Sequence, residues 1–315
     1  MNDPKVRILR GPPTVSLLAQ MEIVPEGASD MGCYYQDRRP ECMSLPSGCL
    51  PNVDTMLPHD ARDLPHDVFH ECREDRTKPG PRNLSDNEVL CELAGRSCYA
   101  SFGHKAGRKT NKDYLGHIWK VGHSSVLYHA KMSFFFGGIS RRVSHELIRT
   151  YVGADRSEEG SPSQESTRFT EHTGCFIEPP YIARIENEAQ RYLESAAFEA
   201  SCRDSYRAYI QFVNRRISAY KLDKGKEPKS MLRKRIYEAA SCYLHHSCET
   251  SMVWTTNPAA IFKQFMERTD THSDLEYQRF AAFLMRVAYA ASPNLFPSIV
   301  ADKLIECSER GVFKL

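Results

Sequence analysis

Residues 114–149 read YLGHIWKVGHSSVLYHAKMSFFFGGISRRVSHELIR, and the changes of hydrophobic period in this stretch decide the fold. Helical spacing runs over residues 111–121 and ends at Gly122, a residue that commonly closes helices. Residues 131–136 alternate between two faces, which predicts a strand. Apolar side chains then recur every four positions over residues 139–147, which predicts a second helix. This order indicates a mixed fold of helices and sheet.

Similar patterns continue on both sides of this stretch. Ser85 with Glu88 three residues later forms a capping box, a typical helix start. Asn257 before Pro258 predicts another start, because Pro fits the first helical position. We predict further helices over residues 185–217, 231–244 and 275–291, a short strand over residues 252–256 and a polar loop over residues 154–166. The residues therefore predict a mixed fold with helix in excess.

The N-terminal part differs from the rest in composition and in hydrophobic periodicity. Residues 6–20 are short and partly apolar, which predicts a strand and a turn. Residues 21–82 are rich in Pro, Asp, His and Cys and show little periodicity, which predicts a loop-rich insertion. We therefore divide the chain into an N-terminal strand with its insertion over residues 1–84 and a main domain over residues 85–315.

The insertion also raises the hypothesis of a zinc site, because thiolates and imidazoles bind that metal. No tight Cys-x-x-Cys spacing occurs there, so ordinary loop residues are the favoured interpretation and no metal is predicted. The candidate ligands are Cys33, Cys42, Cys49, Cys72, His59, His66 and His70.

Composition excludes several functional classes. The 42 Lys and Arg nearly balance the 40 Asp and Glu, giving a net charge of +2, which does not favour a binder of nucleic acid polymers. No run of 18 apolar residues predicts a membrane span, and residues 1–20 do not resemble a secretory signal. Eleven scattered Cys without an export signal indicate reduced thiols. We expect a cytoplasmic protein.

Three segments carry groups that bind anions or polar bases. They are residues 122–129, residues 140–149 with the later residues 163–169, and residues 254–257 with the later residues 268–276. Each segment alone also has a structural interpretation, such as a solvated helix face or a capping set. Together they indicate an Arg-rich site suited to phosphate, with hydroxyls nearby. No Gly-x-Ser-x-Gly elbow, Walker loop or singular Cys nucleophile occurs.

The order of these motifs resembles the flavin-dependent thymidylate synthase family. The opening stretch is similar to that family's Gly-His turn, strand and Ser-Arg helix, and SQESTRF resembles the end of its signature. VWTTN followed by RTDTHSDLE resembles its C-terminal block. The match covers about residues 85–296. The resemblance implies an α+β fold whose central, mostly antiparallel sheet is flanked by long helices, like the thymidylate synthase complementing proteins.

The resemblance also implies an activity. Members of this family methylate dUMP at C5, taking a carbon from methylenetetrahydrofolate and a hydride from reduced FAD, while NADPH reloads the flavin. They are homotetramers whose sites are shared between subunits. An FAD-dependent methyltransferase of this kind is therefore the expected function.

Site residues follow from matching positions in the motifs. The resemblance implies that Arg268 is catalytic, holding the pyrimidine edge and stabilising an ionised N3. It implies that the nucleotide contacts Glu146, Leu147, Ile148, Arg149, Gln164, Glu165, Ser166, Thr167, Arg168 and Arg268. It implies that FAD contacts His123, Ser125, Arg149, Gln164, Thr255 and Asn257.

Two departures from the family keep alternatives open. The family signature opens Arg-His-Arg, whereas this chain has Arg149-Thr150-Tyr151 followed by a longer loop. Glu146 stands where the family has Gln, and a carboxylate accepting from an exocyclic amine is a usual way to recognise cytosine. A variant acting on dCMP, a hydroxymethylating variant and a non-catalytic nucleotide-binding relative are therefore the alternatives to dUMP methylation.

Overall fold

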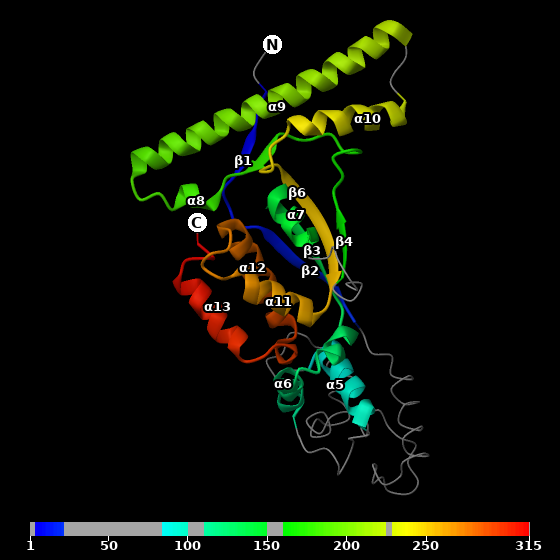
Figure 1. The fold of residues 1–315 in the computed structure, drawn as a ribbon, viewed down its shortest axis with the longest axis vertical. Helices are drawn as coiled ribbons and strands as arrows, with labels where there is room; N and C mark the ends of the chain where they lie inside the picture. The colour runs from blue at the N-terminus through cyan, green and yellow to red at the C-terminus, as the bar shows by residue number, and fades with distance from the viewer. Residues whose placement is uncertain (1–3, 22–83, 100–109, 150–159, 225–228, 315) are drawn as a thin grey trace, which may run out of the picture.

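The computed structural model describes residues 4–21, 84–99, 110–149, 160–224 and 229–314 (Figure 1). For residues 222–224 it describes the backbone only. It is an α+β fold, as predicted. The predicted insertion and its candidate zinc ligands lie outside the described residues. The division of the chain at residue 84 stays a prediction.

A four-stranded sheet forms the centre of the fold. Its order is β2-β3-β6-β4, and every neighbouring pair is antiparallel. A second, two-stranded sheet pairs β1 with β5 in parallel. The strands are β1 Arg7–Leu9, β2 Thr14–Gln20, β3 Met132–Ser140, β4 Ser161–Gln164, β5 Cys175–Ile177 and β6 Glu249–Thr256. The predicted mostly antiparallel central sheet is therefore confirmed.

Helices surround this sheet (Figure 1). The α-helices are α5 Asp86–Tyr99, α6 Asn111–Val121, α7 Arg141–Arg149, α8 Pro180–Ala183, α9 Glu188–Lys224, α10 Ser230–Ala240, α11 Pro258–Arg268, α12 Leu275–Ala291 and α13 Ile299–Glu309. Short 3-10 helices are η3 Ser124–His129, η4 Ser241–Tyr243 and η5 Pro293–Leu295. The long α9 runs beside α10 at one end of the molecule, away from α11, α12 and α13.

The core lies on one face of the central sheet. Met132, Phe134 and Phe136 are fully buried on alternate positions of β3, as their spacing predicted. The ring of Phe136 meets that of Phe280 on α12 edge-on, with centroids 4.8 Å apart. Each such buried aromatic side chain stabilises the fold by about 2–3 kcal/mol relative to exposure. This packing fixes α12 against β3 and so sets the position of the helices that carry the site.

The predicted helix ends are confirmed by their caps. The Ser85 backbone N–H donates to the Glu88 carboxylate at 2.7 Å, and the Glu88 N–H donates to the Ser85 hydroxyl at 3.3 Å. Gly122 closes α6 with a left-handed φ of 73°. The Asn257 side chain accepts from the Ala260 N–H at 3.0 Å and so caps α11.

The predicted loop over residues 154–166 is partly wrong. Its described part contains β4, in which Ser161 lies opposite Thr255 and Pro162 lies opposite Trp254. A short polar edge strand has no apolar alternation, so only pairing with the distant β6 makes it a strand. This pairing matters for the site, because β4 brings Gln164 beside α7.

Candidate active site

Helix α7 presents three faces, because successive residues turn by about 100° around its axis. Val143 and Leu147 point into the core, with exposed fractions of 1% and 0%. Arg142 contacts Asp274 at the start of α12, and Glu146 contacts Arg268 at the end of α11. The remaining face, with Arg141, Ser144, His145 and Ile148, lines a cavity beside β4.

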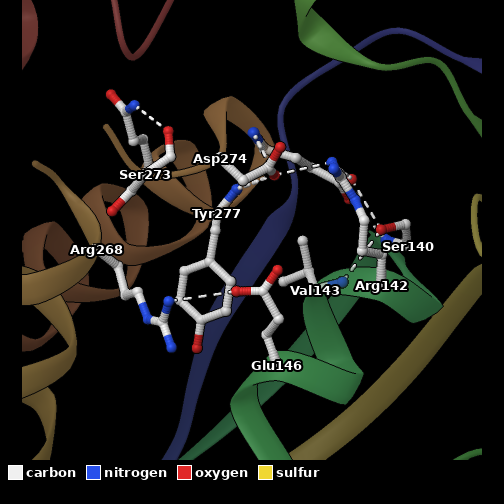
Figure 2. A network of polar contacts seen from close by, with 10 residues as sticks. Ser140, Arg142, Val143, Glu146, Arg268, Ser273, Asp274 and Tyr277 are labelled. Atoms are coloured by element: carbon white, nitrogen blue, oxygen red, sulfur yellow. Dashed lines mark hydrogen bonds and ion pairs between the residues drawn. The ribbon is translucent and has the colours of Figure 1, made fainter. Parts of the chain in front are cut away.

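The catalytic residue implied by the resemblance, Arg268, ends α11 and pairs with Glu146 (Figure 2). Arg268 Nη1 lies 3.3 Å from Glu146 Oε2, and the guanidinium carbon lies 4.9 Å from the centroid of the Tyr277 ring. Arg268 Nε is buried and has no hydrogen-bond partner among the described residues. The structure therefore holds a partly buried cation with one nitrogen available to an acceptor.

A second set of contacts ties the start of α7 to the start of α12 (Figure 2). The Glu276 carboxylate accepts from the Ser140 N–H at 2.7 Å and from the Ser140 hydroxyl at 2.8 Å. Arg142 Nη2 lies 2.8 Å from Asp274 Oδ1, and Asp274 also caps α12. Burial raises the pKa of Glu276, and the hydrogen bonds from Ser140 oppose this rise. These contacts set the direction in which Glu146 projects toward Arg268.

The cavity on the opposite side of α7 has a volume of about 260 Å³. Gln164 Nε2 donates to Ser144 Oγ at 2.8 Å and to Thr250 Oγ1 at 3.2 Å, which fixes β4 against α7. Among the predicted nucleotide residues, the cavity brings together Ile148, Gln164 and Thr167. Its other lining residues are Arg141, Ser144, His145, Ser241, Leu244, His245 and His246.

Sequence reasoning placed Arg141, Ser144 and His145 in the Arg-rich segment suited to phosphate but gave none of them an individual role. Helical spacing from Arg141 could have placed Ser144 and His145 on one face with Ile148. No local signal pointed to His245 and His246, because they come from the irregular segment before β6.

The other predicted nucleotide residues lie apart from Arg268. Glu165 and Ser166 follow β4, and the Glu165 carboxylate accepts from Ser251 Oγ at 3.4 Å. Arg168 is half-exposed and pairs with Glu238 of α10 at 3.1 Å. Leu147 is buried in the core, so its side chain is not available to a ligand. Within one chain the predicted nucleotide residues thus form two groups, on different faces of α7.

Some of the predicted flavin residues are exposed to a ligand, and others are engaged in contacts within the protein. His123 and Ser125 are exposed at the start of η3, and Arg149 is exposed at the end of α7. Thr255 Oγ1 lies 2.8 Å from Ser133 Oγ on the adjacent strand. Asn257 is fully buried and its side chain caps α11, so this residue has a structural role in the described fold.

The loop after the predicted nucleotide residues contains a half-buried histidine. His172 Nδ1 accepts from the Gly174 N–H at 3.0 Å, and the ring lies among Phe176, Tyr206 and Tyr209. Burial, with a smaller effect of the Arg141 charge, lowers the pKa of His172 to about 4. The structure therefore requires the neutral imidazole.

We expect this histidine to make the fold acid-sensitive. As the pH falls from about 6.5 to about 4, the unfolded chain binds a proton at His172 before the folded chain does, which costs roughly 3 kcal/mol of stability. Urea unfolding at pH 7 and at pH 4.5 measures the loss. His172→Phe should be less stable at pH 7, having lost the acceptor for Gly174, but should show a smaller loss on acidification. An equal loss in both proteins would contradict this role of His172.

Two further observations concern the described parts of the chain. Within those ranges no helix combines the length and apolar composition that a membrane span requires. Across the same residues, no group of three or more His, Cys, Asp or Glu side chains is arranged to hold a metal ion.

Comparison with known proteins gives a consistent result. The family model described as "Thymidylate synthase complementing protein" matches residues 82–294. The chain is 35% identical over 234 residues to a flavin-dependent thymidylate synthase of Mycobacterium sp. (strain JLS), which covers 73% of this chain and 87% of that relative. A protein of the same name from Mycobacterium leprae (strain Br4923) is 34% identical over 222 residues, which covers 70% of this chain and 83% of the relative.

A solved structure also shares the fold. The UMP/dUMP methylase PolB from Streptomyces cacaoi, bound with 5-Br UMP, matches with a TM-score of 0.53 over 93% of this chain and 95% of that chain. At 12% identity this likeness concerns the fold alone.

The fold and the family match together show the class of protein, which is an α+β enzyme of a methyl-transferring family. Within that class, the chain belongs to the flavin-dependent thymidylate synthase family. The resemblance drawn from the three motifs is thereby confirmed, and so is the expectation of an enzyme.

Proposed function

We propose that this protein methylates dUMP at C5 to give dTMP, with methylenetetrahydrofolate as carbon donor, FAD as cofactor and NADPH as reductant. The observation that carries the proposal is Arg268, a cation whose buried Nε has no hydrogen-bond partner among the described residues, in a chain of this family. The cytoplasmic location stays a prediction.

Arg268 is suited to the charge that methylation at C5 creates. When C5 acts as a nucleophile, negative charge develops on the pyrimidine ring, and a guanidinium stabilises it because it stays charged and donates several hydrogen bonds. Tyr277 and Glu146 hold the guanidinium before substrate binds. A bound base then accepts hydrogen bonds from Arg268, including the one that its Nε does not make within the protein.

Only some of the residues that the resemblance assigns to FAD are exposed on the surface. His123, Ser125 and Arg149 are exposed and suit an anionic ligand, whereas Asn257 and Gln164 are engaged in protein contacts. Arg149 makes no ion pair with the described residues, so its charge can hold a phosphate. FAD, when bound in reduced form, supplies the hydride that completes the methyl group.

A second copy of the chain completes the site in this proposal. Arg268 and Glu146 lie on one face of α7, whereas Gln164 and Thr167 lie on another. Because the two groups lie on different faces of α7, we infer that one nucleotide contacts them from two copies of the chain. A homotetramer that brings α7 of one copy against the β4 region of another accounts for both groups.

Release of tritium from C5 of labelled dUMP tests the function. The full-length protein with FAD, NADPH and methylenetetrahydrofolate should release the label, because methylation replaces the C5 hydrogen. Product analysis distinguishes a methyl from a hydroxymethyl group. An absence of release from dUMP by flavin-loaded protein would contradict the proposed substrate.

A second candidate substrate is dCMP, and Glu146 favours it. Along the Watson–Crick edge, cytosine presents an amine donor and then two acceptors, N3 and O2. The Glu146 carboxylate beside the Arg268 guanidinium presents an acceptor next to donors, which matches this order. Uracil presents an acceptor at the first position instead.

Replacing Glu146 with Gln tests the role of this residue. If Glu146 contacts the base, Glu146→Gln should move the ratio of kcat/KM for dUMP to that for dCMP toward dUMP by about tenfold, because the amide also donates. The measurement is tritium release from both nucleotides, compared with the half-exposed control Glu199→Gln on α9, away from the candidate site. An unchanged ratio would show that Glu146 does not select the base.

A further inference from the structure

The long helix α9 is divided by charge. Residues 188–204, in its first half, contain four Asp and Glu and two Arg. Residues 205–237, which continue through its second half and into α10, contain ten Lys and Arg but two Asp and Glu, a net charge of +8. The whole chain has a net charge of +2, so the other residues together carry −6. The balanced total, which did not favour a binder of nucleic acid polymers, therefore conceals one strongly basic segment.

Apolar packing between α9 and α10 places these cations on the surface. Val213 and Ile236 are buried where the two helices meet, and Ile217 and Leu232 pack beside them. The end of this helix pair lies at the edge of the molecule, away from α11, α12 and α13 (Figure 1). Its exposed cations, which we call the basic tip, are Arg215, Arg216, Lys221, Lys229, Arg233 and Arg235.

Most of the basic tip is not neutralised within the described structure. Arg215, Arg216, Lys229 and Arg235 form no ion pair with the residues that the structure describes. Earlier on α9, in contrast, Arg203 pairs with Glu199. Cations from two helices that gather without carboxylates create a positive potential, which attracts a polyanion.

The residue types of the basic tip favour a duplex over a single strand or a membrane. Single-stranded nucleic acids stack their bases on aromatic side chains, but the sole aromatic residue in the sequence of residues 214–235 is Tyr220, which is half-buried. A helix on a membrane surface needs an exposed apolar face, whereas Leu232 and Ile236 of α10 pack against α9. The phosphate backbone of a duplex is held by exposed cations.

We propose that the basic tip binds the phosphate backbone of duplex DNA without reading its sequence. The major groove of B-form DNA is about 12 Å wide and admits an α-helix, whereas that of duplex RNA is too narrow for side chains. Lys229, Arg233 and Arg235 lie at the start of α10 on the surface. The start of α10 therefore fits between the two phosphate backbones that border the major groove, and Arg215 and Arg216 of α9 extend the contact.

Fluorescence anisotropy of a labelled DNA duplex, titrated with the full-length protein, tests the proposal. We expect a Kd of about 10⁻⁴–10⁻⁶ M at physiological salt, the usual range for binding through phosphates without sequence specificity. If each of the six cations neutralises one phosphate, the logarithm of the association constant should fall with the logarithm of the salt concentration with a slope of about −5.

Charge reversal on α9 tests the residues. The double variant Arg215→Glu with Arg216→Glu should weaken DNA binding by about tenfold or more and make the salt slope shallower by about 2, because two phosphate contacts are lost. Both side chains are exposed, so the fold should be retained. The matched control, Lys112→Glu with Lys120→Glu, makes the same change of net charge on exposed residues of α6, away from the basic tip, and should bind DNA like the wild type (Figure 1).

Several results would overturn the proposal. One is absence of DNA binding by the wild type at about 10⁻⁴ M protein. Another is equal weakening in the charge-matched control, which would reduce the effect to net charge. Tighter binding of duplex RNA, or of vesicles of phosphatidylserine and phosphatidylcholine, would assign the basic tip to a different partner. Tritium release from dUMP should be unchanged in the Arg215 and Arg216 variant, so failure of DNA binding and failure of the proposed reaction are distinguishable.

Discussion

Arg268→Ala is expected to lower kcat for tritium release from dUMP by about 10²- to 10³-fold, the usual effect of removing a donor that stabilises developing charge. The fold should change little. The ion pair with Glu146 is partly exposed, and such pairs contribute about 0–1 kcal/mol. The contact with the Tyr277 ring adds about 0.5–1 kcal/mol. Steady-state kinetics and the midpoint of thermal unfolding measure the two effects separately.

Two further variants make the Arg268 result specific. Arg268→Lys keeps a positive charge but loses the planar set of guanidinium N–H donors, so we expect a kcat between those of the wild type and Arg268→Ala. Arg203→Ala removes an arginine that pairs with Glu199 on α9 and should leave kcat at the wild-type value. Wild-type turnover in Arg268→Ala would remove Arg268 from the reaction.

Glu276→Ala is expected to destabilise the fold by about 2–4 kcal/mol. The change leaves the buried Ser140 N–H and hydroxyl without their acceptor, and each unsatisfied group costs about 1–3 kcal/mol. The same change removes the contacts of Ser140 with α12 and leaves only that of Arg142 with Asp274, so Glu146 is held less firmly and kcat should fall as well. Urea unfolding and tritium release measure the two consequences.

The amide variant separates hydrogen bonding from charge at this position. Glu276→Gln keeps one acceptor for Ser140, so it should recover about half of the lost stability. Glu199→Ala removes a half-exposed carboxylate on α9 and should change stability by less than about 0.5 kcal/mol. If Glu276→Ala unfolds at the wild-type urea concentration, the contact between α7 and α12 does not depend on this carboxylate.

Features that depend on neighbouring residues could be predicted from the sequence. The capping box at Ser85 and the Asn257 cap join groups three residues apart, and both form as expected. The boundaries of α6 and α12 also agree with the sequence pattern, because apolar periodicity fixes which face is buried. The same patterns predicted a mixed fold with helix in excess, whereas the α+β class with its antiparallel sheet came from the family resemblance.

Features that depend on distant pairing could not be predicted from local patterns. The polar strand β4 exists because it pairs with β6, almost ninety positions later. The role of Glu276 depends on Ser140, which lies 136 residues before it. The cavity also joins segments far apart in the chain, so no spacing could connect Arg141 with His246. The site residues named from the family motifs stay predictions, and their separation into two groups required the structure.

The parallel pairing of β1 with β5 bears on how the chain acquires its fold during synthesis. Arg7 is 168 positions before Cys175, its partner in the pair. At about 5–20 residues per second, the N-terminal strand must wait roughly 8–34 s on the ribosome before its partner has been made. During that interval its apolar edge has no native neighbour. Chaperone demand in the cell should therefore depend on the rate at which the codons between Leu9 and Ile177 are translated.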